Sequence, residues 1–96
     1  MDIAKICADY EAATSVFVKI VESVSSTELD RSSGEGWSAR QVIHHMADSE
    51  AQSYARLRRL LAEPNGSTIQ GYDEGAWAEC STLGYTNLPI ENSMAV

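Results

Sequence analysis

The spacing of apolar side chains predicts a long amphipathic helix near the start of the chain. Apolar residues recur every three or four positions from Ile3 to Val24, as on one face of a helix. They are Ile3, Ile6, Cys7, Tyr10, Ala13, Phe17, Ile20, Val21 and Val24. The alternation of a β-strand does not fit these positions. We expect the next segment, SSTELDRSSGEG, to be a connection, because small and polar residues break the period.

A second long helix is predicted over Ala39–Ala62. Ser38 and Gln41 have the spacing of a capping box, in which each side chain bonds the backbone N–H of the other residue. Trp37 and Val42 are placed to pack on each other across this helix start. The sequence Pro-Asn-Gly follows and ends the helix.

The apolar stripe of this second helix separates its two adjacent histidines. The stripe contains Ala39, Val42, Ile43, Met46, Ser53, Leu57, Leu60 and Leu61. At about 100° per residue, His45 falls at the border of the stripe and His44 falls nearly opposite. We therefore expect His45 to point toward a neighbouring helix and His44 to face water. Because adjacent helical residues diverge, the pair does not form a two-ligand metal motif.

Glu50 falls inside the same stripe, where a carboxylate needs a partner. We expect a hydrogen bond from a tyrosine, tryptophan or arginine of another helix, in preference to a catalytic role. His45 and Glu50 lie roughly 140° apart around the helix, so they are poor co-ligands within one chain.

Two shorter helices complete the predicted fold. Asp73 is the expected N-cap of one, with Tyr72 and Trp77 packing across its start and Trp77 filling the core. The other begins near the end of the chain, with Pro89 in its first turn. The fold class is therefore all-α: one domain over residues 1–96, an up-and-down bundle whose long helices, Ile3–Val24 and Ala39–Ala62, form an antiparallel hairpin.

Charge and cysteine content exclude several classes of protein. The net charge of −7, from 14 acidic and 7 basic residues, disfavours binding to nucleic acids and to anionic membranes. We expect the local cluster of Arg56, Arg58 and Arg59 to be a solvated patch. Cys7 and Cys80 form no CxxC pair, the first residues do not resemble a signal peptide, and no apolar run is long enough to span a bilayer. These features predict a cytoplasmic protein.

Self-association is expected from the size of the apolar stripes. Two helices of about 22 residues would each be roughly 33 Å long, and together they cannot cover both of their own stripes. A homodimer, or a higher homo-oligomer, in which two hairpins build one four-helix bundle would cover them.

Several motifs together resemble the DinB-like/YfiT-like superfamily of metal-binding bundles. They are the Trp-Ser cap at residues 37–38, the stretch HHMADSE, the arginine-containing end of the second helix, and the stretch YDEGAW. The resemblance implies a four-helix bundle that holds zinc or nickel on three histidines. It places the first ligand at His45 and the other two in an HxxxH pair on a later helix.

The sequence departs from that pattern after the second long helix. No histidine follows His45, so the chain has no HxxxH pair and looks like the front half of a family domain. Two functions are therefore expected. One is a bundle without a complete metal site that acts through assembly or partner binding. The other is a metal-dependent hydrolase or thiol S-transferase. Its site would be completed by another chain or by a further segment, with two-fold symmetry pairing His45 residues and Asp48 or Glu50 assisting.

Overall fold

The computed structural model describes residues 1–32, 34 and 36–96, and these residues are all-helical or irregular, with no β-strand among them. The helices are α1 (Ile3–Ser23), α2 (Ser26–Leu29), α3 (Ala39–Ala62), α4 (Glu74–Glu79) and α5 (Glu91–Met94). The all-α prediction is confirmed. No helix in the described ranges combines the length and the apolar character needed to cross a bilayer.

The helix starts follow local capping chemistry. The Ser38 hydroxyl accepts from the Gln41 backbone N–H at 3.2 Å, and the Gln41 side chain accepts from the Ser38 backbone N–H at 2.8 Å. The carboxylate of Asp73 likewise accepts from the backbone N–H of Ala76 at 3.0 Å. Both predicted helix starts are therefore confirmed, since these bonds satisfy donors that the first helical turn leaves free.

The remaining boundaries depart from the predictions in two places. The segment expected to be a connection contains α2, which begins with its own capping box between Ser25 and Glu28. The last helix, α5, begins at Glu91, so Pro89 lies before it and not in its first turn.

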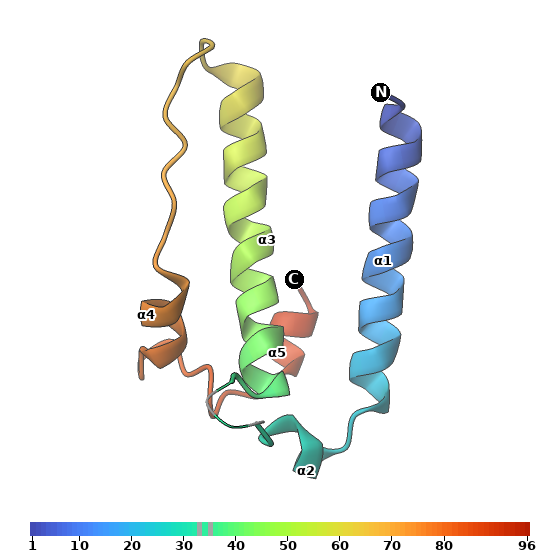
Figure 1. The fold of residues 1–96 in the computed structure, drawn as a ribbon, viewed down its shortest axis with the longest axis vertical. Helices are drawn as coiled ribbons and strands as arrows, with labels where there is room; N and C mark the ends of the chain where they lie inside the picture. The colour runs from blue at the N-terminus through green and yellow to red at the C-terminus, as the bar shows by residue number, and fades with distance from the viewer. Residues whose placement is uncertain (33, 35) are drawn as a thin grey trace.

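The two long helices run antiparallel, as Figure 1 shows, with α5 between them near the end of α1 and the start of α3. The short helix α4 lies on the other side of α3, reached by an extended segment. The antiparallel hairpin is thus present. Its two helices are joined mainly by residues of α2 and of the α5 region, which pack against the same core. The Cα radius of gyration is 15.7 Å, whereas a compact chain of this length would have about 12.5 Å.

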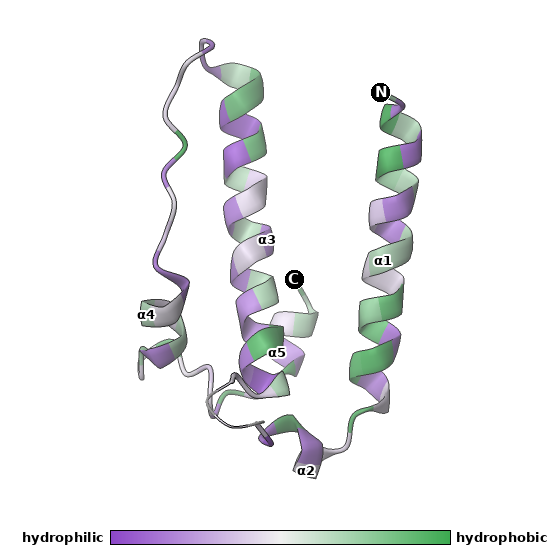
Figure 2. Cartoon of the chain, viewed as in Figure 1, coloured by the Kyte–Doolittle hydropathy of each residue, from purple (hydrophilic) through white to green (hydrophobic). Residues whose placement is uncertain are grey.

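The hydrophobic core occupies one end of the molecule. Val21, Leu29 and Ile43 are buried there, where the end of α1, α2 and the start of α3 converge. Five half-buried residues pack on them: Phe17, Val24, Ala39, Ile90 and Met94. Figure 2 shows hydrophobic residues continuing along both long helices toward the opposite end, where no other helix covers them.

Candidate functional site

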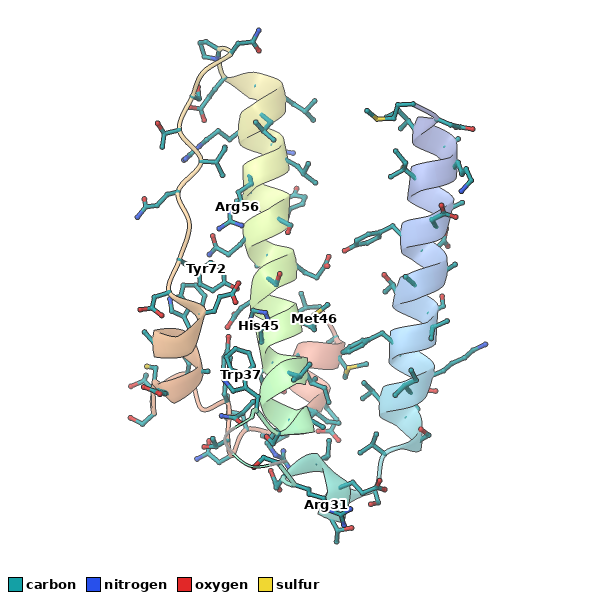
Figure 3. The ribbon with its side chains drawn as sticks, in the orientation of Figure 1. Arg31, Trp37, His45, Met46, Arg56 and Tyr72 are labelled. Carbon is teal, nitrogen blue, oxygen red and sulfur yellow. The ribbon has the colours of Figure 1, made fainter. Side chains whose placement is uncertain are left out.

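His45 lies in the second turn of α3, on the side that faces Trp37, as Figure 3 shows. It is half-buried, and the two rings meet edge to face with centroids 5.1 Å apart. Its Nδ1 atom is buried and has no hydrogen-bond partner among the residues that the structure describes. A ligand or metal arriving from solvent would therefore meet Nε2. The half-buried position agrees with the border placement that the helical wheel predicts.

His44 is not a surface residue, and that prediction is wrong. Its side chain is 5% exposed. Its Nε2 lies 2.9 Å from the carbonyl oxygen of Leu88, and its Nδ1 lies 2.7 Å from the hydroxyl of Ser93. Because a carbonyl only accepts, the proton is assigned to Nε2, and in a neutral ring Nδ1 then accepts from the Ser93 hydroxyl. The segment that leads into α5 covers this face of α3, which a wheel with a single buried stripe leaves open to water.

Asp48 lies one turn after His44 and contacts Tyr85. The Tyr85 hydroxyl donates a hydrogen bond to the Asp48 carboxylate, and the tyrosine is 2% exposed. Burial raises the pKa of Tyr85 well above its usual range, and the bond to the Asp48 carboxylate raises it further. The Asp48 carboxylate is thus held in a structural contact with the segment between α4 and α5.

Glu50 points to the opposite side, toward α1. Its carboxylate accepts a hydrogen bond from the hydroxyl of Tyr10, and this bond raises the pKa of Tyr10. A tyrosine partner on another helix was among the expected partners, and this expectation is confirmed. The expected burial is not, because Glu50 is exposed on the rim of an open groove.

The two carboxylates considered beside His45 are therefore held apart by their own tyrosine partners. Within residues 1–32, 34 and 36–96, no three histidine, cysteine, aspartate or glutamate side chains gather where they could hold a metal ion. A catalytic zinc site takes three protein ligands. The described residues by themselves do not fit such a site, and ligands from elsewhere would have to complete it.

Tyr72, Trp77 and Arg56 form a cluster on the His45 side of α3. The sequence did not predict that these three residues lie together. The Tyr72 ring packs on Trp77 with centroids 4.4 Å apart, and the Arg56 guanidinium lies 5.8 Å from the Tyr72 ring centroid. The Tyr72 hydroxyl is buried, and no residue in the described part of the chain bonds it. The YDEGAW motif predicts the Tyr72–Trp77 contact, but Arg56 is too distant in sequence for the motif to predict its position.

The fold is that of a small helical-bundle protein. Its one candidate metal ligand is the half-buried His45 on α3. The sequence profile of the DinB superfamily matches residues 9–95. The chain belongs to this superfamily, as its motifs indicated.

Similar curated proteins come from bacilli. One from Oceanobacillus iheyensis is 46% identical over 78 residues, which are 79% of this chain and 42% of that protein. A second from the same organism is 34% identical over 94 residues, 97% of this chain and 52% of that protein. A Bacillus cereus protein is 43% identical over 61 residues, 64% of this chain and 33% of that protein. All three carry the name "putative metal-dependent hydrolase".

The chain spans about a third to a half of the length of these curated relatives. No solved structure matches the chain.

Proposed function

We propose that the chain is an assembly unit whose two long helices complete a bundle with the helices of a second copy. One observation carries the proposal: the apolar faces of α1 and α3 continue beyond the core without cover. Leu57, on the stripe of α3, is 60% exposed. Other large hydrophobic residues exposed on the two helices are Ile3, Ile6, Tyr10, Leu60 and Leu61.

A groove between the two helices gives these faces a recess into which side chains of a partner helix can pack. Its volume is about 270 Å³, with Phe17 on one wall, Met46 on the other and Met94 from α5 at its base. The Tyr10–Glu50 hydrogen bond lies on its rim. Apolar surface of this extent is rarely left in water, and a two-fold contact between identical hairpins buries the same patch on each copy.

Sedimentation velocity over a range of micromolar concentrations tests this proposal. We expect a dimer or a higher homo-oligomer whose population rises with protein concentration. A monodisperse monomer that still unfolds cooperatively would contradict the assembly role, because the uncovered stripes would then be stable in water.

A metal-dependent hydrolase or thiol S-transferase is the second candidate. Its support is the half-buried His45, whose Nδ1 has no hydrogen-bond partner among the described residues, together with relatives whose name refers to metal dependence. Zinc or nickel would bind His45, with further ligands from another copy or from residues outside the chain described here. Figure 3 shows Met46 on the side of α3 toward α1 and His45 on the side toward α4. A partner seated in the groove would approach Met46 and not His45, so a shared metal centre needs a different contact.

Metal titration of untagged protein tests this second candidate. We expect any binding of zinc or nickel to be lost in His45→Ala and kept in His44→Ala, because the His44 nitrogens are already bonded to Leu88 and Ser93. Binding should strengthen from about pH 5.5 to about pH 7.5, since a ligand imidazole must be neutral. Tight stoichiometric binding of zinc or nickel would favour the enzyme over the assembly role. An equal loss of metal binding in folded His44→Ala and His45→Ala would exclude His45 as the specific ligand.

A further inference from the structure

A polar pocket lies between the second half of α3 and the extended segment that follows it, away from the apolar groove. Its volume is about 310 Å³. Gln52, Arg56 and Arg59 line it from α3, and Gln70 and Tyr72 line it from the segment. Two guanidinium groups and one side-chain amide therefore come from the α3 wall of this small cavity, opposite the backbone of Gln70 and the ring of Tyr72.

The guanidinium of Arg56 is held in place by two contacts, one with the backbone carbonyl of Gln70 and one with the ring of Tyr72. Its Nη2 donates to the carbonyl oxygen of Gln70 at 3.1 Å. Its Nε is buried and has no hydrogen-bond partner among the described residues, and its Cζ lies over the ring of Tyr72, which also packs on Trp77. Figure 3 shows Arg56 and Tyr72 on the same side of α3. These contacts fix the plane of the guanidinium and leave Nη1 as the nitrogen for a ligand.

The positive charge of Arg56 is not balanced by a carboxylate. Arg59 forms an ion pair with Glu63, with Nε and Oε2 2.9 Å apart. Within the described ranges, Arg56 has no ion pair, and it meets an aromatic ring and a carbonyl instead. The pocket lining thus carries about one positive charge without an ion-pair partner among the described residues, with the carboxylates of Glu74 and Asp48 near enough to act on Tyr72, in a chain whose net charge is −7. An anion drawn to this site is attracted by Arg56 locally and repelled by the rest of the chain.

We propose that this pocket binds a small molecule through a single carboxylate group. Nη1 of Arg56 would bond one carboxylate oxygen, and the side-chain amide of Gln52 would donate to the other. One free positive charge matches a monoanion, whereas a phosphate dianion would keep an unbalanced negative charge. The volume is at the lower end of the range for ligand sites, which suits a molecule of a few heavy atoms beyond the carboxylate.

The test uses N-acetylglycine, which has one carboxylate and one amide. It is titrated into the ¹⁵N-labelled full chain while the side-chain amide signals of Gln52 and Gln70 are followed, with inorganic phosphate titrated in parallel. We expect saturable shifts with a Kd of about 1 mM for N-acetylglycine. Phosphate should bind several-fold more weakly. Tighter binding of phosphate would overturn the assignment to a carboxylate, and shifts that never saturate would overturn the site.

Arg56→Gln should weaken binding about tenfold, because it removes the charge-assisted bond. Arg58→Gln is the matched control, since it removes the same charge from a guanidinium that lies over Tyr54, outside the pocket. It should leave the Kd unchanged within about twofold. Equal weakening in both variants would reduce the effect to net charge and overturn the proposal.

If circular dichroism shows that Arg56→Gln does not fold, Arg56→Lys replaces it. That variant keeps the charge and loses the planar fork, so it should show a smaller loss of affinity than the removal of the charge. Unchanged affinity in folded Arg56→Lys would overturn the role of the guanidinium. The inference depends neither on assembly nor on a metal, because the pocket lies within one chain and does not include His45.

Discussion

The hydroxyl of Tyr10 on α1 donates a hydrogen bond to the carboxylate of Glu50 on α3, 40 positions further along the chain. Both residues line the groove between the two long helices, and both are exposed. The bond therefore connects the helices beyond the core, at a place where they share little packing. It gives the groove a polar rim above apolar walls.

Removing this bond should weaken the link between α1 and α3 by a small amount. In a double-mutant cycle of Tyr10→Phe and Glu50→Ala, we expect a coupling free energy below about 1 kcal/mol, because both groups are exposed to water. Urea denaturation measures each corner of the cycle. Tyr54→Phe is the control, since Tyr54 does not line the groove; coupling to Glu50 of the same size there would contradict a specific bond.

His44→Ala should destabilise the fold by about 1–3 kcal/mol, because it removes a buried side chain and leaves the half-buried Ser93 hydroxyl without its partner, while the Leu88 carbonyl keeps its bond from Arg40. The bonds that it removes attach α5 and the residues before it to α3. Thermal unfolding followed by circular dichroism measures the loss. His45→Ala provides the comparison, since its Nδ1 has no hydrogen bond to lose. Equal losses in the two variants would argue against the His44 contacts.

Stability should fall when the pH rises above about 10, with Tyr85 as a main cause. Its pKa is raised above the ordinary value of 10.0 by burial and by the Asp48 carboxylate. The unfolded chain therefore loses this proton first. The stabilisation that the Tyr85 hydroxyl contributes is complete below the pKa that Tyr85 has in the unfolded chain, and it is lost as pH rises toward the pKa of Tyr85 in the folded chain. The slope for one such group is at most about 1.4 kcal/mol per pH unit.

The Tyr85→Phe variant isolates this contribution. Denaturation at about pH 8 and about pH 11 should show a smaller alkaline loss in the variant than in the unaltered chain. Tyr54→Phe is again the control, because Tyr54 is exposed. An unchanged alkaline loss in Tyr85→Phe would show that other groups cause it.

Leu57→Asp should shift the chain toward monomer with little effect on its own packing. Leu57 is exposed within one chain, but in a bundle of two copies the new carboxylate would be buried without a partner. Ala51→Asp adds the same charge on the same helix at an exposed position outside the stripe. Sedimentation velocity compares the two variants. The same shift toward monomer in both would attribute the effect to added charge and not to the apolar face.

Local signals in the sequence were enough to predict most of the helices. The starts at Ser38 and Asp73 depend on side chains within three positions of the bonds that they make. The capping box of Ser25 and Glu28 has the same spacing, but α2 is only four residues long and shows no apolar period. That helix was therefore missed, although its N-terminal signature was present.

The environment of His44 could not be predicted in the same way. Its partners lie 44 and 49 positions away, at Leu88 before α5 and at Ser93 within it, and these segments are too short to show an apolar period. A helical wheel places residues relative to the strongest apolar stripe, and it cannot show that a later segment of the chain covers a second face of the helix. The burial of Tyr85 depends on the same later segment and was unpredictable for the same reason.

The position of the core at one end also gives the two long helices unequal ends. Backbone amides near Val21 and Ile43 can exchange with solvent only when that core opens, whereas those near Ile3 and Leu61 are protected by little more than their own helical turns. In a single chain the far turns would fray at a low energetic cost. A second copy bound there would slow the exchange of these amides. Hydrogen exchange at the far ends of α1 and α3 would therefore report association.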